Sequence, residues 1–463
     1  MMNLKLKKVY TVSNKARKPR LFLQHIVCEA AGLNPGENLY ISINEYDEKI
    51  VIQNYPSEAA HTIKVASRVS KISGERRPLI DTAGDKYATI IDVKQKIEIS
   101  VFKKGNKSQI VIEPLKYNLF ENETLPAVKD ERIRLLSIAA GAGIGTAAFV
   151  DTNYYSAIQE VELEEDSAEV LLHNFPNSYV FNGNMADCHQ VYKSDIAMVT
   201  LPCNEHSNLG DLSGNVVNDL ILATAKIIKT SQAEALFFEN VPNFYKSESW
   251  NLLKDLLSED YPFWVQKDLD AWDFGSIANR KRTYVCSFKS EDQFNEFRFP
   301  APQKMKRKKL KDFLEPAGVT HEWKSVDDWM TSFNSRTAWA ERSLDLTFVS
   351  KEAERIACLP KRYTSHSASS SYVLSEDKKS WRFLTIEEIK KILAVPKWFQ
   401  LTKHLQKIRT YELLGQSIDC RVVKAIANRL AFSFMKIKDK IKPVSKKIQG
   451  YGVKSDGQLQ LLI

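Results

Sequence analysis

The chain of 463 residues lacks an apolar run long enough to cross a membrane, because a spanning helix needs about 18 uninterrupted apolar residues. Its longest candidate, residues 135–150, is interrupted by glycine at three positions. The N-terminus is basic, but no apolar segment follows it, so we expect no secretory signal. The sequence therefore predicts a protein without a membrane anchor.

Clustered cysteines are also absent. The six cysteines stand far apart, at positions 28, 188, 203, 286, 358 and 420. No CxxC pair or His/Cys cluster indicates zinc, and nothing resembles the disulfide pattern of a small secreted protein. We therefore expect a reduced, intracellular protein that holds no metal.

Positive charge is in moderate excess, with a formal net charge of +9. Three basic runs carry much of it, at residues 3–20, 304–311 and 436–447. Any one of them is equally consistent with a solvated surface or tail. Together they favour a polyanion such as nucleic acid as a partner.

Residues 1–125 have the pattern of a β-rich module. A short helix over 22–31 is expected to stop at Gly32, and strands at 39–43 and 49–53 are expected to pair. A second hairpin is predicted from 97–102 and 109–113. The phrase GLNPGENLYISI resembles the loop and strand of bacterial swapped-hairpin DNA-binding modules, so added DNA contacts are a hypothesis for this module.

Strand-length apolar runs alternate with helix-like segments from Ile133 onward. This alternation predicts a doubly wound, mainly parallel α/β sheet. The rhythm is lost between residues 290 and 380, where a smaller inserted domain is expected, and α-structure returns over 385–438. The predicted strands are 135–138, 157–163, 196–201, 235–238 and 283–288.

A glycine-rich turn, Ser137-Ile-Ala-Ala-Gly-Ala-Gly-Ile-Gly145, follows the first of these strands. Such a turn lets the backbone approach a ligand, and the next helix offers its free amide groups. Glu162 ends the following strand, about 20 residues on, where an acid can bond ribose hydroxyls. Glu164 and Glu165 are alternatives in the same acidic cluster.

Three further reactive side chains stand at the ends of later strands. Cys203 directly follows Pro202 after the strand 196–201. A lone cysteine is more often a small buried hydrophobe than a nucleophile. Glu239, however, ends the next strand, and Arg280 and Arg282 lead into the one after. Active sites of open α/β sheets form at such strand ends, so the combination predicts a catalytic site.

The order and spacing of these segments resemble the C5-cytosine-specific DNA methyltransferase family over about residues 133–430. The glycine turn and Glu162 resemble its cofactor motifs, and Pro202-Cys203 with Ser207 its PCQxxS loop. The remaining matches are Glu239-Asn-Val, Asn279-Arg-Lys-Arg282 for QxRxR, Arg382-Phe-Leu-Thr with Glu387, Glu388 and Pro396 for RxLTxRE…P, and residues 411–418 with Val422 and Ile426 for GNSV…V…I.

This resemblance implies a Rossmann-like doubly wound methyltransferase sheet and a set of domains around it. The expected ranges are an N-terminal module over 1–125, a catalytic domain over 131–290, a target recognition domain over 291–380, a return to the catalytic domain over 381–440 and a basic tail over 441–463. The implied activity is DNA methylation, as in restriction–modification, by a monomer that acts on double-stranded DNA. The implied location is the cytoplasm, with a bacterial or phage-encoded protein associated with the nucleoid.

The resemblance also implies the roles of individual residues. Cys203 is expected to add to C6 of a flipped-out cytosine, Glu239 to bind the N3/N4 edge, and Arg282, with Arg280 as a second candidate, to hold O2 and orient the glutamate. S-adenosylmethionine is the implied cofactor. Its implied contacts are Ala139, Gly141, Gly143, Glu162, Asn184, Pro202 and Ser417.

Several positions depart from the family pattern, mainly at the cofactor site. Ala139 stands in place of the usual phenylalanine, and Asn184 in place of an aspartate. Two alternatives therefore stay open. One is an RNA cytosine methyltransferase acting on tRNA, although that branch carries a Cys-Phe-Thr insertion absent here. The other is a catalytically impaired DNA-binding relative.

Residues 290–380 carry four candidates for contact with DNA bases. Tryptophan and arginine can stack on bases or reach base edges. Tryptophan in such a region is nevertheless more often a packing residue. The candidates are Trp323, Trp329, Trp339 and Arg336.

Overall fold

The computed structural model describes residues 2–57, 61–116, 122–202, 216–302, 305–316, 319, 321–335 and 343–437, together with the backbone of two short strands, β24 (Tyr451–Val453) and β25 (Leu459–Leu461). Among these residues, no helix is long and apolar enough to cross a membrane.

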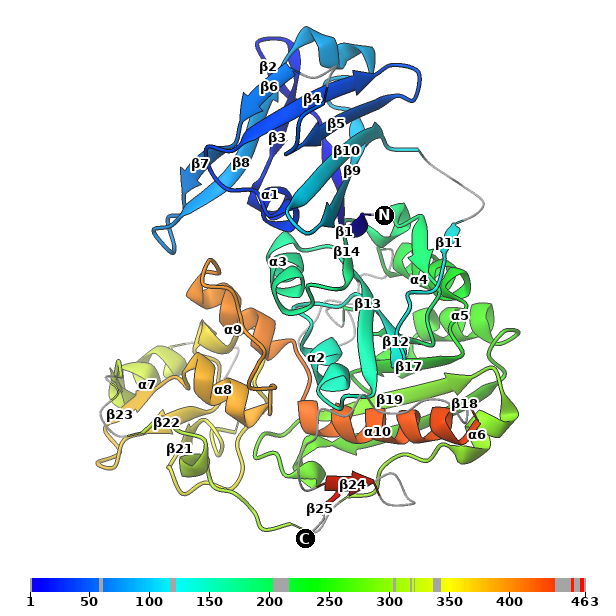
Figure 1. Cartoon of the computed structure of the whole chain (residues 1–463). Helices are drawn as coiled ribbons and strands as arrows, with labels where there is room; N and C mark the ends of the chain where they lie inside the picture. Colours follow the sequence, from blue (N-terminus) through cyan, green and yellow to red (C-terminus); the bar gives the residue numbers. More distant parts are fainter. Residues whose placement is uncertain are drawn as a thin grey trace.

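A sheet of 13 strands runs through the centre of the molecule (Figure 1). Seven of its strands are β18 (Phe263–Asp270), β19 (Lys281–Phe288), β17 (Ala235–Asn240), β16 (Ile196–Val199), β12 (Ile133–Ile138), β13 (Tyr155–Glu162) and β14 (Tyr179–Asn182), in that spatial order. Neighbours from β17 to β14 are parallel, whereas β19 is antiparallel to both β17 and β18. The predicted doubly wound α/β sheet is confirmed.

Helices cover both faces of this half of the sheet because its strands are apolar on both sides. Leu135 belongs to one core cluster with α2, α3 and α10, and its neighbour Leu136 to a second cluster with α4 and α5. This burial on two faces explains the continuous apolar runs in the sequence. The helices are α2 (Ile144–Val150), α3 (Glu165–Asn174), α4 (Val216–Ser231), α5 (Glu248–Leu257), α6 (Glu291–Glu296) and α10 (Cys420–Ile437).

Strand β18 was not predicted. Its sequence, FWVQKDLD, has charged residues where a buried strand would be apolar, since it forms the edge of the sheet and several of its side chains are exposed. An edge strand needs only one partner, and β19 supplies it. Edge strands of this kind are hard to recognise from an apolar pattern alone.

The N-terminal strands continue the same sheet. β1 (Asn3–Thr11) pairs in parallel with β14 on one side and antiparallel with β9 on the other. The predicted pairs of strands 39–43 with 49–53 and 97–102 with 109–113 are confirmed by the pairing of β4 with β5 and of β9 with β10. The other strands of this part are β4 (Asn38–Asn44), β5 (Lys49–Gln53), β6 (His61–Lys64), β9 (Lys96–Lys104) and β10 (Lys107–Pro114).

A second, smaller sheet lies beside these strands, together with α1 (His25–Ala31). The predicted end of this helix at Gly32 is confirmed, because Gly32 caps it with a φ of 69°, a left-handed conformation that glycine adopts without strain. The strands of the second sheet are β2 (Ser13–Lys15), β3 (Lys18–Leu23), β8 (Arg76–Ala83) and β7 (Ala66–Val69). A parallel pair, β11 (Glu123–Leu125) and β15 (Gln190–Tyr192), lies near α4.

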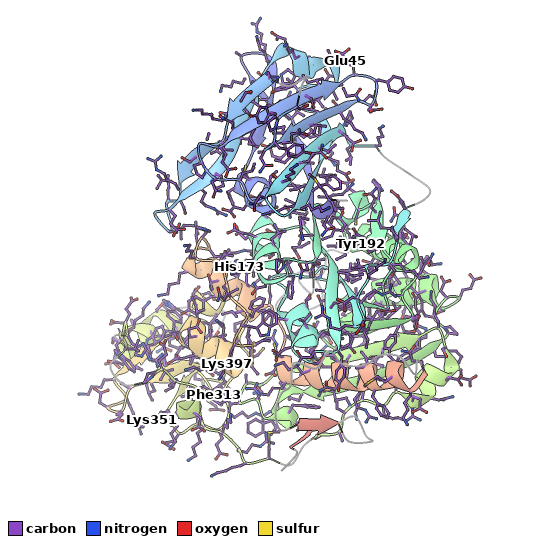
Figure 2. All side chains as sticks on the ribbon, in the orientation of Figure 1. Glu45, His173, Tyr192, Phe313, Lys351 and Lys397 are labelled. Carbon is purple, nitrogen blue, oxygen red and sulfur yellow. The ribbon has the colours of Figure 1, made fainter. Side chains whose placement is uncertain are left out.

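The segment after α6 forms a small sheet and helices of its own. Its strands are β20 (Lys324–Ser325), β23 (Ser380–Arg382), β22 (Tyr372–Leu374) and β21 (Phe348–Val349), and its helix is α7 (Val326–Asn334). Helices α8 (Ile386–Ile392) and α9 (Lys407–Gly415) follow before α10 returns to the large sheet. Figure 2 labels His173, which lies at the end of α3. Its Nε2 atom lies 3.2 Å from Gln400 Oε1, so the chain between α8 and α9 contacts a helix that packs on the large sheet.

Candidate active site

The glycine-rich turn lies at the carboxyl end of β12, where the strand order of the sheet reverses. From β12 the chain builds outward to β13 and β14 on one side and to β16 and β17 on the other. Ligands of open α/β sheets bind at such a switch point. Ala139, Gly141 and Gly143 adopt positive φ angles of 54°, 56° and 83°.

Gly143 has no room for a side chain. A Cβ at this position would lie 2.6 Å from Leu171 Cδ2 and 2.8 Å from a ring carbon of Phe175, both on the side of α3. A Cβ at Gly141 would meet no atom within 4 Å, so the space beside Gly141 is open. The turn is thus packed on its α3 side and free at Gly141, which leaves room for a ligand.

Glu162, at the end of β13, faces this turn. Its two carboxylate oxygens accept from Gly141 N at 2.7 Å and from Glu164 N at 2.8 Å. Burial raises the pKa of Glu162, and the two backbone N–H groups oppose that rise. The alternative acids have other partners, since Glu164 pairs with Arg409 and Glu165 with Lys8.

The C-terminal segment comes back against the same turn. A Cβ at Gly145 would lie 3.6 Å from Ile418 Cδ1, and the Cys420 thiol lies 3.9 Å from the carbonyl of Ile144. Ser417, in the turn before α10, donates to the carbonyl of Leu414 at 2.7 Å and is half-buried. Asn184 is exposed beyond β14 and accepts from Ala186 N at 3.0 Å.

The strand β16 ends beside the glycine turn. Thr200 Oγ1 donates to the carbonyl of Ala139 at 2.9 Å, and Asn240 Nδ2 donates to the carbonyl of Leu201 at 3.1 Å. Pro202 is exposed directly after this anchored end. Cys203 lies outside the described residues, as does Ser207. The chain that leads to Cys203 is therefore hydrogen-bonded to the ends of both neighbouring strands, β12 and β17.

Glu239 and Arg282 form an ion pair at the next strand ends. Arg282 Nε lies 3.3 Å from Glu239 Oε1, and Glu239 is 8% exposed. Burial raises the pKa of Glu239, while Arg282 and then Arg280 oppose the rise. The structure thus brings together a buried carboxyl and a guanidinium on β17 and β19.

Arg280 is buried and makes a different set of contacts. Its guanidinium donates to the carbonyls of Leu359 at 3.3 Å and Gly415 at 3.2 Å, and its Nε has no hydrogen-bond partner among the described residues. These contacts join the start of β19 to two segments far along the chain. Of the two candidate arginines, the described ion pair with Glu239 belongs to Arg282.

Two residues that contribute to this geometry were assigned no contact of their own from the sequence. Thr200 and Asn240 fix the backbone of the glycine turn and of the residue before Pro202 through the bonds given above. Asn240 stands within the Glu239-Asn-Val segment, so its motif was a usable signal. Nothing in the sequence marks Thr200, because one hydroxyl at the end of a strand is common.

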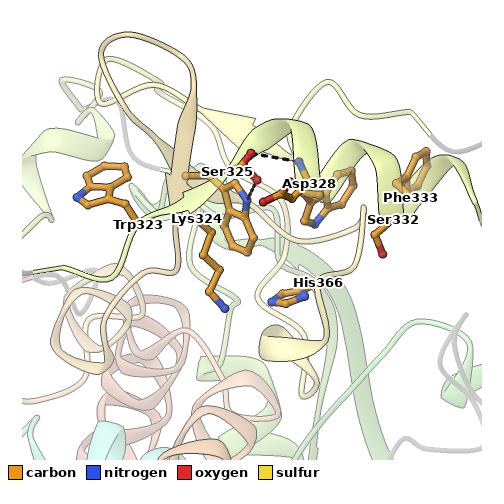
Figure 3. A pocket seen from close by; sticks show the side chains of 9 residues that line it. Trp323, Lys324, Ser325, Asp328, Ser332, Phe333 and His366 are labelled. Carbon is orange, nitrogen blue, oxygen red and sulfur yellow. Dashed lines mark hydrogen bonds between the residues drawn. The ribbon is translucent and has the colours of Figure 1, made fainter.

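A hollow of about 460 Å³ lies in the segment between α6 and α8. Figure 3 shows Trp323 and Phe333 at opposite ends of it, with Lys324, Asp328 and His366 between them. Trp323 is 44% exposed, whereas Trp329 is buried and stacks on Phe333 with ring centroids 5.1 Å apart. Trp323 is thus open to a ligand and Trp329 packs. Arg336 and Trp339 lie outside the described residues.

One group of potential metal ligands occurs in the described part of the chain, formed by Glu315, His321 and Glu388. Both oxygens of Glu388 accept from the Arg382 guanidinium at 2.8 Å. One of them also accepts from Glu315 N at 2.9 Å. The carboxylate of Glu388 is thus committed to a buried ion pair, and we assign no metal to this group.

A family model described as C-5 cytosine-specific DNA methylase matches residues 133–431. The Type II methyltransferase M.Bsp6I of Bacillus sp. (strain RFL6) is 24% identical over 323 residues, 65% of this chain and 100% of that protein. The tRNA (cytosine(38)-C(5))-methyltransferase of Spodoptera frugiperda is 20% identical over 332 residues, 63% of this chain and 97% of that protein.

Among solved structures, the Entamoeba histolytica methyltransferase EhMeth superposes with a TM-score of 0.54 at 18% identity. The match covers 67% of this chain and 100% of that one. At this identity the likeness concerns the fold.

Proposed function

Because the chain belongs to the C-5 cytosine-specific DNA methylase family, we propose that it transfers a methyl group from S-adenosylmethionine to C5 of cytosine in double-stranded DNA, with Cys203 as nucleophile. The observation that carries this proposal is the ion pair between buried Glu239, at the end of β17, and half-buried Arg282, at the start of β19. Strand β17 lies next to β16, which leads into Cys203. A stacked base cannot reach such buried groups, so the target cytosine must be flipped out.

Each residue of the site has a separate role toward the target base. The Cys203 thiolate adds to C6 and turns C5 into a nucleophile, which splits one difficult step into two easier ones. Glu239 binds the N3/N4 edge, and its raised pKa favours the protonated carboxyl that can donate to N3 as charge develops there. Arg282 holds Glu239 in place and donates to O2 of the cytosine. After transfer, loss of the C5 proton lets the thiol leave.

The described residues fit the nucleoside part of S-adenosylmethionine. Glu162 presents a buried carboxylate for the ribose hydroxyls, already oriented by two backbone N–H groups. The open space beside Gly141 leaves this part of the turn accessible to a ligand. When bound, the cofactor supplies the electrophilic methyl group. Ser417, Asn184 and Pro202 are the further proposed contacts.

We propose that residues 291–380 meet the DNA with the face that carries Trp323 and Lys324. Trp323 is exposed and can stack on a base. The Lys324 ammonium lies 5.0 Å from the Phe383 ring centroid and 5.7 Å from that of Trp381, so it is held at the edge of the hollow.

The test is methyl transfer from labelled S-adenosylmethionine to double-stranded DNA. We expect incorporation at cytosine C5 with the wild-type protein and none with Cys203→Ala. Cys28→Ala is the matched control, since Cys28 lies in α1, where its thiol donates to the carbonyl of Leu23, and it should retain activity. Equal incorporation by Cys203→Ala would refute the proposed nucleophile.

A second candidate function is methylation of cytosine in tRNA. The similarity to the Spodoptera frugiperda tRNA methyltransferase over nearly its full length favours it. The same assay with tRNA as acceptor separates the two functions. Incorporation into tRNA without incorporation into DNA would replace the proposal, and incorporation into neither would indicate an impaired relative.

A further inference from the structure

The first strand of the chain contributes a side chain to the neighbourhood of the cofactor site. In the large sheet, Lys8 of β1 is in register with Asn182 of β14, and Asn182 is in register with Glu162 of β13. Residues in register on adjacent parallel strands project from the same face of a sheet. These three residues therefore form one row, at the carboxyl ends of β13 and β14 and within β1.

Hydrogen bonds run along this row. Lys8 Nζ donates to Asn182 Oδ1 at 2.6 Å, and Asn182 Nδ2 donates to the carbonyls of Glu162 at 3.2 Å and Leu163 at 3.0 Å. Lys8 Nζ also lies 2.9 Å from Glu165 Oε2 in the first turn of α3. The ammonium group thus contacts Asn182 on one side of the turn after Glu162 and Glu165 on the other.

Burial makes this row rigid. Lys8 is 9% exposed and Asn182 is 1% exposed, so neither can exchange its partner for water at low cost. Lys8 stabilises this orientation of Asn182, because a flipped amide would place its N–H₂ group against the ammonium. Its nitrogen is then fixed toward the backbone of Glu162, whose carboxylate reaches Gly141 of the glycine turn.

We propose that Lys8 is a positioning residue of the cofactor site, acting through Asn182 on the backbone that presents Glu162. The N-terminal module is therefore a working part of the methyltransferase. This inference rests on the proposed function, because it takes Glu162 as the acid that binds the ribose of S-adenosylmethionine.

Lys7 provides a matched control on the same strand. It is similarly buried, and its ammonium forms an ion pair with Glu98 of β9, within the N-terminal strands. It is in register with Phe181 and projects from the opposite face. Lys7→Met and Lys8→Met both remove a buried ammonium from β1, but only Lys8→Met releases Asn182.

The experiment is calorimetric titration of S-adenosylmethionine into the full-length wild type, Lys8→Met and Lys7→Met, with the thermal midpoint of each recorded. We expect Lys8→Met to raise the cofactor Kd about tenfold, as loss of an outer partner does at other sites, and Lys7→Met to change it less than about twofold. Lys8→Arg, which keeps the charge and the donors, should restore most of the affinity.

Steady-state kinetics separate positioning from general damage. Lys8→Met should raise KM for the cofactor and leave KM for DNA unchanged. Asn182→Asp provides an independent route if Lys8→Met does not fold, because it keeps the acceptor for Lys8 and removes the donors to the Glu162 and Leu163 carbonyls. It should also raise the cofactor Kd.

The outcomes distinguish this inference from the function on which it rests. A wild-type protein that binds no S-adenosylmethionine overturns both. A wild type that binds it, together with Lys8→Met and Asn182→Asp variants that bind it equally well, overturns the role of Lys8 alone. An equal loss in Lys7→Met and Lys8→Met has the same consequence, because it indicates damage to β1 as a whole.

Discussion

Glu162 and Glu239 end two strands of one sheet, and their partners differ. Both are 8% exposed, and burial raises the pKa of both. Glu162 is held by backbone N–H groups of the glycine turn and of Glu164. Glu239 is held by the Arg282 guanidinium.

This difference matches two kinds of chemistry. Backbone donors fix the direction of a carboxylate without a nearby cation, which suits an acid that accepts hydrogen bonds from a neutral ribose. A cation beside a buried carboxyl stabilises the carboxylate that forms when the acid gives up its proton. This arrangement suits an acid that donates to a base during the reaction. Substitutions that remove the charge of one acid at a time test this division.

The largest effect is expected from Glu239→Gln. The amide keeps the shape of the carboxyl but cannot pass a proton to N3, so kcat should fall by about a thousandfold, within the range for loss of a general acid. Rates at saturating cofactor and DNA measure it. The Kd for S-adenosylmethionine should stay within about twofold of wild type. A fall in cofactor affinity with kcat retained would contradict the assignment of Glu239 to the base.

Arg282→Met should have the next largest effect. It leaves Glu239 buried without the cation beside it, so kcat should fall by about a hundredfold, as when one group that stabilises developing charge is removed. Arg282→Lys should fall between wild type and Arg282→Met, because an ammonium keeps the charge but not the planar set of donors. If Arg282→Met retained wild-type kcat, the ion pair would have no part in the reaction.

Glu162→Gln should lower cofactor affinity more than turnover. A carboxylate that accepts from ribose hydroxyls is worth about ten- to a hundredfold in Kd relative to a neutral amide. Calorimetric titration gives the Kd, and kcat at saturating cofactor should stay within about threefold of wild type. Glu164→Gln is the control, since Glu164 is exposed and pairs with Arg409. Equal losses in the two variants would assign the ribose contact elsewhere.

The sequence predicted the doubly wound sheet and the strand ends that carry Glu162 and Glu239, because parallel strands buried on both faces are continuous apolar runs and their polar ends stand out. It also predicted the stop of α1 at Gly32. These features depend on local composition and on spacing along the chain, both of which can be read without knowing the fold.

The sequence could not predict the pairing of β1 with β14. Lys8 and Asn182 are separated by 174 positions along the chain, and their contact depends on the register of two distant strands. The contacts of Arg280 with Leu359 and Gly415 were missed for the same reason. The expected roles of Cys203, Arg336 and Trp339 remain predictions, because these residues lie outside the described part of the chain.

The smallest expected effect concerns stability and pH. The folded-state pKa of both acids is raised above the ordinary value of 4.5, so the folded protein holds these protons more tightly than the unfolded chain. The resulting stability is fully present below that value and is lost as pH rises through the folded-state pKa. Glu162→Gln and Glu239→Gln lack this loss of stability. The thermal midpoint of each variant minus that of the wild type should therefore increase by about 1–3 °C from pH 5 to pH 8.

The Arg282→Met background should separate the two acids in this measurement. Arg282 opposes the rise of the Glu239 pKa, so its removal should raise that pKa further. The change with pH in the midpoint difference between Glu239→Gln and its parent should then become larger. Glu162 has backbone partners, and the difference that Glu162→Gln produces should stay the same. Thermal midpoints of the single and double variants across this pH range measure both. An equal increase for both acids would mean that Arg282 acts on the whole site and that the two carboxyls are not held independently.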